Sequence, residues 1–150
     1  MEAWVAILVA VSTVMGALEA EMAEQHALPI TWFDVLNRLD QAPDHRLRMH
    51  EIEEMSVFTR SGMTRLADRL EAAGLVRRER DAGDRRGVYL AITNAGRARL
   101  GEVWPDHMRG IEEHFASHIS ASDAAALRSI AARVAGDRPA LGQRAQRPQP

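Results

Sequence analysis

Cysteine is absent from this sequence of 150 residues, and lysine is absent as well. Without thiols the chain cannot form disulfides, thiolate metal sites, a cysteine nucleophile or a thiol redox sensor. A chain without disulfide chemistry fits the reducing cytoplasm, and we predict that location. All 19 basic residues are arginines, so arginine alone supplies the side chains that are positively charged at neutral pH with histidine uncharged.

Aromatic residues are also few, at 5% of the chain, and the net charge is only −2. The charge is unevenly distributed, however. Residues 1–59 contain 3 arginines and 10 acidic residues, residues 60–100 contain 10 arginines and 5 acidic residues, and residues 101–150 contain 6 of each. The basic middle segment predicts a local surface for a polyanion such as nucleic acid, with a merely solvated arginine face as the alternative.

Charged residues are missing from one long run, residues 4–18. The run is shorter than the roughly 20 apolar residues that cross a bilayer. Glu2 and no basic residue precede it, which is atypical of a secretory signal, although a cleaved signal stays an alternative. Because apolar side chains would surround a helix here on nearly all sides, we predict a helix over 3–26 that packs against another chain, and no membrane partner.

Helical periodicity continues through the first half of the chain. After Pro29 the apolar residues fall on one helical face: Trp32, Val35, Leu36 and Leu39. A short strand at 47–49 and a short helix at 50–55 should follow. Thr59 is a favourable N-cap for the next helix, and Gly74 is a typical residue to end it.

The period of the apolar pattern then changes from 3.6 to two. This change predicts strands at 75–80 and 88–92 on either side of a charged hairpin loop at 81–87. A long helix should then run to about His118 with a kink at Pro105, and a last helix should run to about residue 135.

A helix, a turn, a second helix and a two-stranded hairpin make up a winged helix-turn-helix, so we expect a mainly α fold with a small β-hairpin wing (α+β). The second helix, 59–73, suits the major groove, and a basic hairpin at 81–87 can reach the adjoining minor groove, whose negative potential attracts arginine. The side chains outside the apolar stripe of that helix and on the hairpin are the predicted DNA contacts: Thr59, Arg60, Ser61, Thr64, Arg65, Arg69, Asp84, Arg85 and Arg86.

Three motifs in this region resemble the MarR family of transcriptional regulators. They are SGMTRLADRLEAAGLVRR at 61–78, DRRGV at 84–88 and LAITNAG at 90–96. The resemblance covers roughly residues 5–135 and is most specific over the second helix and the wing. It implies that Asp84 braces the hairpin and that Arg86 enters the minor groove, whereas Asp84 taken alone also suits an ordinary turn.

Members of this family act as homodimers, and the resemblance implies that the first and last helices interlock two copies of the chain. Two-fold symmetry then implies a pseudo-palindromic DNA operator. The expected activity is repression of transcription. The expected organisation is a single domain at 1–135, comprising a winged helix-turn-helix at 28–93 and dimerisation helices at 3–26 and 94–135, with a disordered tail at 136–150.

A small aromatic or anionic effector is a further implication of the resemblance, because most of the family responds to such ligands. The pocket would lie between the dimerisation helices and the winged helix. Its candidate wall residues are Met15, His26, Trp32 and Met108. Trp32 also suits a core position, since it lies on an apolar helical face. The lack of cysteine excludes the oxidation mechanism of the peroxide-sensing branch of the family.

Three histidines, His107, His114 and His118, are spaced to share one face of the long predicted helix. His114 and His118 have the i, i+4 spacing that can share a metal, and Asp106 or Glu113 could add a carboxylate. Because two histidines do not complete a metal site, we predict no metal and no other cofactor. The preferred interpretation is that these histidines lie on the surface or at an interface without a metal. A pH-sensing histidine cluster at a dimer interface is another alternative.

Two other classes of function compete with DNA binding. An enzyme is not expected, because the chain has no G-x-S-x-G, no phosphate-cradling glycine loop and no H-E-x-x-H. A winged helix that contacts only proteins is the second alternative, and the arginines of the second helix and wing disfavour it. The sequence therefore predicts double-stranded DNA and a second copy of the chain as partners.

Overall fold

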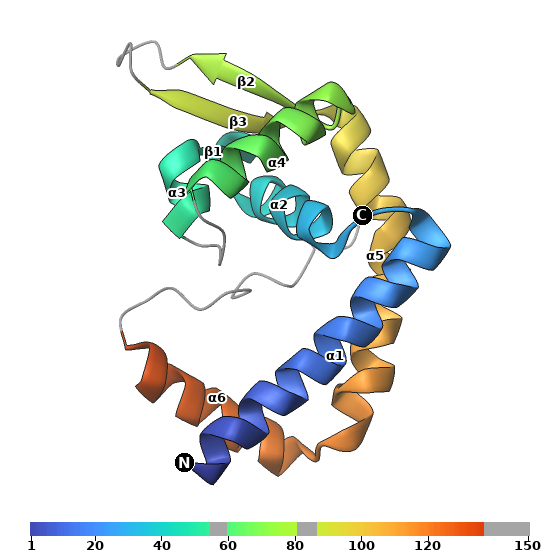
Figure 1. Cartoon of the computed structure of the whole chain (residues 1–150), viewed down its shortest axis with the longest axis vertical. Coiled ribbons are helices and arrows are strands. Elements are labelled where there is room, and N and C mark those ends of the chain that lie inside the picture. The colour runs from blue at the N-terminus through green and yellow to red at the C-terminus, as the bar shows by residue number, and fades with distance from the viewer. Residues whose placement is uncertain (55–59, 81–86, 137–150) are drawn as a thin grey trace.

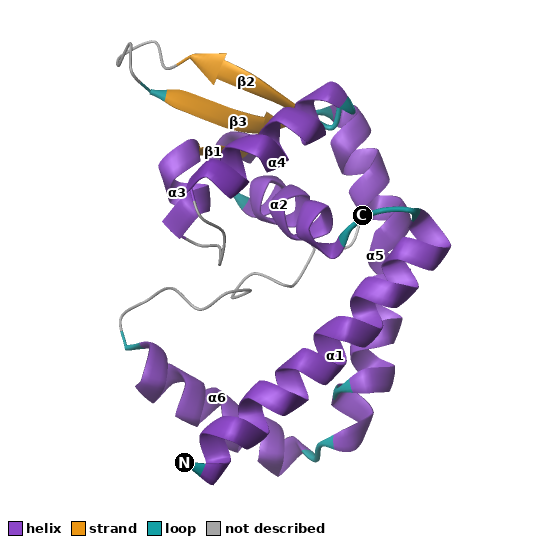
Figure 2. Cartoon of the chain, in the orientation of Figure 1, coloured by secondary structure: helices purple, strands orange, loops and turns teal. Residues whose placement is uncertain are grey.

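The computed structural model describes residues 1–54, 60–80 and 87–136. The chain is mainly helical and has two parts, which Figures 1 and 2 show. One is a lobe of short helices and a small sheet. The other consists of two long helices, α1 (Glu2–His26) and α5 (Asn94–His114), that lie side by side. The predicted fold class is confirmed.

The core of the lobe is built from α2 (Ile30–Gln41), α3 (Met49–Glu54) and α4 (Arg60–Ala72). Pro29 immediately precedes α2. A residue at this position donates no hydrogen bond within the helix, so the missing N–H of proline has no cost there. The predicted apolar face of α2 is largely confirmed, because Val35, Leu36 and Leu39 are buried. Phe33 is buried as well, which periodicity alone did not predict.

The helix α4 carries the most regular apolar stripe in the lobe. Its buried residues are Met63, Leu66, Ala67 and Leu70. The helix ends as predicted at Gly74, whose φ of 73° is a left-handed conformation that glycine adopts without strain. The N–H of Gly74 donates to the carbonyl of Glu71, and the N–H of Leu75 donates to the carbonyl of Leu70. These two bonds satisfy carbonyls that the end of the helix leaves free.

A three-stranded antiparallel sheet covers one side of the lobe. Its strands are β1 (Arg46–Arg48), β2 (Val76–Arg80) and β3 (Val88–Ile92), in the order β1-β3-β2. Leu90 in the central strand is completely buried and pairs with Leu47 on one side and Arg78 on the other. The predicted hairpin strands are therefore confirmed, while most of the loop between them lies outside the described residues.

The side chain of Thr93 joins the long helix α5 to the lobe. Its Oγ1 accepts the N–H of Gly96 as the helix N-cap and lies 2.7 Å from the carbonyl oxygen of Gly74. The N–H of Thr93 also donates to the carbonyl of Leu75. Thr93 thus caps α5 and also hydrogen-bonds to the backbone carbonyl groups of Gly74 and Leu75, where the chain passes from α4 to β2.

The long helix ends one turn earlier than the sequence predicted. It passes through Pro105 and stops at His114, after which Phe115 leaves the helical region and residues Ala116–His118 form a short 3₁₀ turn, η2. The Ser117 hydroxyl donates to the carbonyl of Glu113, and a side chain that satisfies the backbone in this way competes with helix continuation. The last helix, α6 (Ala121–Ala135), begins with a capping box of Ser120 and Asp123.

Most of α1 is exposed in the single chain, where only Leu18 and Met22 are buried. The helix extends well beyond the apolar run, and by length and composition it meets the requirement for crossing a membrane. The sequence argument that the segment is too short was therefore wrong. Signal sequences and buried helices of water-soluble proteins share the same property. The helix α6 is also largely exposed.

The junction at Gly96 gives a first prediction. A Cβ atom at this position would lie 2.1 Å from the Leu75 carbonyl oxygen and 2.8 Å from Ile92 Cγ1. Gly96→Ala should therefore lower the free energy of unfolding by about 1–3 kcal/mol or more, measured by urea denaturation. Ala98→Ser adds one atom at an exposed position of the same helix and should change it by less than about 0.5 kcal/mol. Equal stability of the two variants would contradict the close packing at Gly96.

Candidate nucleic-acid interface

The exposed face of α4 lies opposite its buried stripe. Thr64, Arg65 and Arg69 are all exposed there. Arg60 and Ser61 belong to the first turn of the same helix. Thr64, Arg65 and Arg69 thus present a hydroxyl group and two guanidinium groups on one helical surface, and such groups contact base edges and phosphates. The remaining predicted DNA contacts lie outside the described residues: Thr59, Asp84, Arg85 and Arg86.

A cluster of ion pairs holds β2 against α4. The Arg78 guanidinium donates to Asp68 Oδ1 at 2.7 Å and to the Glu71 carboxylate, and the Arg78 N–H donates to the same carboxylate. Burial alone would lower the pKa of Arg78, but the hydrogen bonds that Arg78 donates to Asp68 and Glu71 outweigh it and raise that pKa. Arg78 therefore positions the hairpin relative to α4, and its charge is already balanced within the chain.

Arginines also gather on the outer face of the sheet. The guanidinium carbons of Arg46 and Arg48 lie 4.7 and 5.2 Å from the centre of the Tyr89 ring, a cation–π geometry. Glu79 lies beside them and accepts from Arg77 at 2.8 Å and from Arg46 at 3.2 Å. The hydrogen bond from Arg77 contributes most to lowering the pKa of Glu79, although burial opposes the shift. Sequence analysis missed this cluster because it depends on strand register.

An open depression of about 620 Å³ lies where α4 approaches the first turn of α2. It is lined by Thr31, Gly62, Arg65, Leu66, Asp68 and Arg69. Gly62 lines the depression without contributing a side chain to it. Thr31 was not predicted, because no sequence signal says which turn of α2 faces α4.

The four predicted wall residues of an effector pocket lie on α1, α2 and α5, and none lines this depression. His26 hydrogen-bonds with Asp106 at 2.8 Å, and the carbonyl of His26 accepts from Arg99. Hydrogen bonds from Arg109 first, and from His26 second, lower the pKa of Asp106. Met15 and Met108 are exposed, and Trp32 is partly buried against the core.

The three histidines of the predicted long helix are separated by the structure. The His107 ring packs 4.2 Å from that of Phe33, and burial lowers its pKa although Asp34 opposes the shift. His114 contacts Glu21 on α1 through its Nε2 atom. His118 lies in the turn η2 beyond the end of α5. The expected shared helical face is therefore wrong, because α5 stops before the residue that would complete it.

The chain is similar to proteins of known type. A family model described as "MarR family" matches residues 27–87. The transcriptional repressor YetL of Bacillus subtilis is 35% identical over 79 residues, which cover 53% of this chain and 47% of YetL. The regulator PecS of Dickeya dadantii is 33% identical over 104 residues, or 68% of this chain and 61% of PecS. The chain spans about half the length of the first curated relatives that it matches.

Solved structures show the same architecture over nearly the whole chain. Sco3205 of Streptomyces coelicolor, a MarR family transcriptional regulator crystallised in complex with DNA, superposes with a TM-score of 0.83. It is 26% identical, and the match covers 92% of this chain and 87% of Sco3205. These relatives are named as transcriptional regulators, in agreement with the prediction that the chain is not an enzyme. In its family-model match, its curated relatives and its winged-helix fold, the chain is similar to the MarR family of transcriptional regulators.

Proposed function

We propose that this chain is a sequence-specific DNA-binding transcriptional regulator, most simply a repressor. The observation that carries the proposal is the exposed face of α4, where Thr64, Arg65 and Arg69 lie opposite a fully apolar stripe. In this proposal α4 enters the major groove, and the hairpin loop at 81–87 enters the minor groove. The DNA complex of Sco3205 supports it, since that protein has the same fold.

The proposed active form is a homodimer. Large apolar side chains of α1 are exposed in the single chain, including Trp4 at 61% and Val9 at 59%. On α6 Leu127, Ile130 and Val134 are exposed as well. Contiguous apolar surface of this kind marks a contact with another molecule. A second copy of the chain would bury both helices, so the proposed single domain spans 1–135.

A second copy explains the apolar α1 better than a membrane or a cleaved signal does. The match to Sco3205 leaves out 8% of 150 residues, which is 12 residues, whereas α1 has 25. Part of α1 therefore has a counterpart in a regulator crystallised with DNA. This supports a location in the cytoplasm, where the DNA is.

The proposal includes a small aromatic or anionic effector, bound where α2 meets α5. Two buried nitrogen atoms in the described part of the chain have no hydrogen-bond partner, Trp32 Nε1 and His107 Nδ1. Such atoms leave a hydrogen-bonding capacity that a ligand acceptor could satisfy. Met15, His26 and Met108 stay candidates for the same pocket, as the sequence proposed.

The experiment that tests the function is selection of bound sequences from a random pool of DNA duplexes at moderate salt. We expect enrichment of a pseudo-palindrome, because a two-fold symmetric dimer presents two copies of α4. Affinity should also fall steeply as salt rises, since phosphate contacts release counterions. Sedimentation of the same sample establishes whether it is a folded dimer.

No enrichment from a folded dimer would overturn the DNA-binding proposal and favour a winged helix that contacts only proteins. Because a copurified effector could hold the DNA-free state, the selection is repeated after denaturing and refolding the protein. Enrichment of a single, non-repeated half-site would support DNA binding and contradict the dimer.

The wing gives a separate prediction. Arg86→Ala should weaken binding to the selected operator by about tenfold to hundredfold, because the guanidinium would lose its place in the minor groove. Fluorescence anisotropy measures the affinity, and thermal unfolding verifies that the dimer is intact. Arg109→Ala removes an exposed arginine near the far end of α5 and should leave the affinity unchanged. Equal affinities of the Arg86→Ala and wild-type proteins would exclude the wing from the interface.

The face of α4 gives another prediction. Arg65→Ala should relax base preference at one position in each half-site, because a guanidinium that pairs with a base edge carries sequence information. Arg69→Ala is the matched comparison: it removes a guanidinium that would bind a phosphate one turn further on, so it should weaken all sequences alike and reduce the salt slope by about one. Repeating the sequence selection with both variants separates the roles. A uniform loss of affinity for Arg65→Ala would assign Arg65 to the phosphate backbone.

A further inference from the structure

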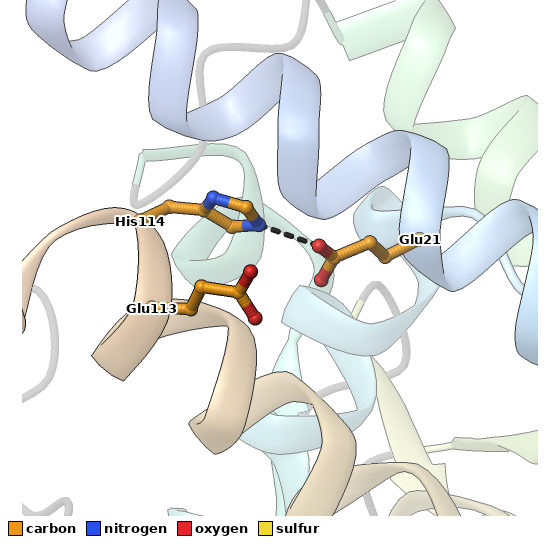
Figure 3. Close-up of side chains that lie close together, drawn as sticks. All are labelled: Glu21, Glu113 and His114. Carbon is orange, nitrogen blue, oxygen red and sulfur yellow. Dashed lines mark hydrogen bonds and ion pairs between the residues drawn. The ribbon is translucent and has the colours of Figure 1, made fainter.

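We propose that Glu21, Glu113 and His114 form a binding site for a divalent first-row transition-metal ion where α1 contacts α5. The ligand atoms of the three side chains all lie within 4.8 Å of one another. Figure 3 shows the two carboxylates and the imidazole of His114 converging from the two helices on one small volume. This site is separate from α4 and the wing, so it does not depend on the proposed function.

The geometry needs only small movements to hold an ion. His114 Nε2 lies 2.5 Å from Glu21 Oε1, and the Glu113 carboxylate faces the same pair (Figure 3). Imidazole nitrogen and carboxylate oxygen bind such ions at about 2.0–2.2 Å, so neighbouring ligand atoms of one ion lie roughly 3 Å apart. Rotation of the two glutamate side chains would bring all three atoms to that separation, with water filling the remaining positions.

The charges of the cluster favour a cation. Two carboxylates and one imidazole share the volume, and a protonated His114 balances only one of them. The nearest arginine along α5 is Arg109, whose guanidinium donates to Asp106 at 2.6 Å and to Gln25 at 3.5 Å. Within the described residues no hydrogen bond or ion pair holds the Glu113 carboxylate. A dication with both carboxylates bound would remove the remaining negative charge.

The backbone on which the cluster stands is held in place. A Cβ atom at Gly110 would lie 2.7 Å from Leu18 Cδ2 and 2.8 Å from Glu21 Oε2, so the lack of a side chain there lets Glu21 approach α5. Further along the same pair of helices, His26 bonds to Asp106, and Arg99 bonds to the carbonyl of His26. Ligands on two packed helices are positioned more accurately than ligands on loops.

The donor set indicates the class of metal. Imidazole suits Zn²⁺, Fe²⁺ and Ni²⁺, carboxylates also accept Mn²⁺, and the chain has no thiolate to select a softer ion. The affinity of a site made of nitrogen and oxygen ligands is higher for Zn²⁺ than for Mn²⁺. We therefore expect Zn²⁺ to bind more tightly than Mn²⁺.

Glu113 separates this proposal from a plain ion pair. A hydrogen bond between His114 and Glu21 needs only those two residues and gives the exposed Glu113 no role. A metal site needs all three. Glu113→Gln keeps the size of the side chain and removes one ligand charge without touching the pair of Glu21 and His114.

The test is calorimetric titration of the tag-free, full-length protein with Zn²⁺ in a weakly coordinating buffer at pH 7.5. We expect one ion per chain with a micromolar or lower Kd. Glu113→Gln and His114→Gln should each weaken binding at least tenfold, because even the outer-shell partners of metal ligands are worth about 10–100-fold. His118→Gln, a histidine outside the cluster, is the matched control and should bind as the wild type does.

Thermal unfolding supplies a second readout, since Zn²⁺ that binds only the folded chain raises its Tm. Addition of Zn²⁺ should raise the Tm of the wild type and of His118→Gln, and it should leave the Tm of Glu113→Gln unchanged. No binding by the wild type, or equal binding by the wild type and Glu113→Gln, overturns the proposal. If His114→Gln fails to fold by circular dichroism, Glu113→Gln alone decides, because its side chain is exposed.

Discussion

The carbonyl groups of Gly74 and Leu75 form the point on which the geometry of the molecule depends. The end of α4, the start of β2 and the N-terminus of α5 all meet there, and Thr93 bonds to both carbonyls. Gly96 packs so closely against Leu75 that a methyl group would not fit. Since α4 carries the proposed DNA-reading face and α5 leads away to α1, this junction sets the direction of one relative to the other.

The arginines between residues 60 and 100 have different roles in the structure. The excess of arginine between residues 60 and 100 suggested a single basic surface, but the structure divides these residues between two tasks. Arg78 is paired with Asp68 and Glu71 and holds the hairpin on α4, and Arg77 is paired with Glu79. Arg65 and Arg69 stand on the exposed face of α4. Net charge by segment thus marked the part of the chain that carries the proposed DNA-binding face, but it does not show that Arg78 is engaged with Asp68 and Glu71.

Local signals in the sequence predicted the fold well because they act within one element. The spacing of Met63, Leu66 and Leu70 specifies which face of α4 is buried, and Gly74 specifies where the helix ends. The cap at Thr93 is equally local. The exposed side of α4, and with it part of the candidate site, follows from the same periodicity.

The failures of prediction all involve contacts between elements. The His107, His114 and His118 face assumed an uninterrupted helix, whereas Ser117 and Phe115 end α5 first. Glu21 lies 93 residues from His114 in sequence, so its part in the cluster had no local signal. The Arg46, Arg48 and Tyr89 cluster depends in the same way on the register of β1 with β3.

The contact between α1 and α5 is formed largely by polar side chains. It contains little apolar burial from α1, which contributes only Leu18 and Met22, and it depends instead on polar pairs such as His26 with Asp106 and His114 with Glu21. Imidazole and carboxylate groups can both bind a divalent metal ion, whereas an apolar contact offers no ligand atom. Because α5 continues from β3 through the rigid junction at Thr93, a change in how α1 sits on α5 has a direct structural route to the lobe that carries α4. In the proposed homodimer the exposed apolar surface of α1 would contact the second chain, and the polar pairs with α5 would help to set the angle at which that surface is presented.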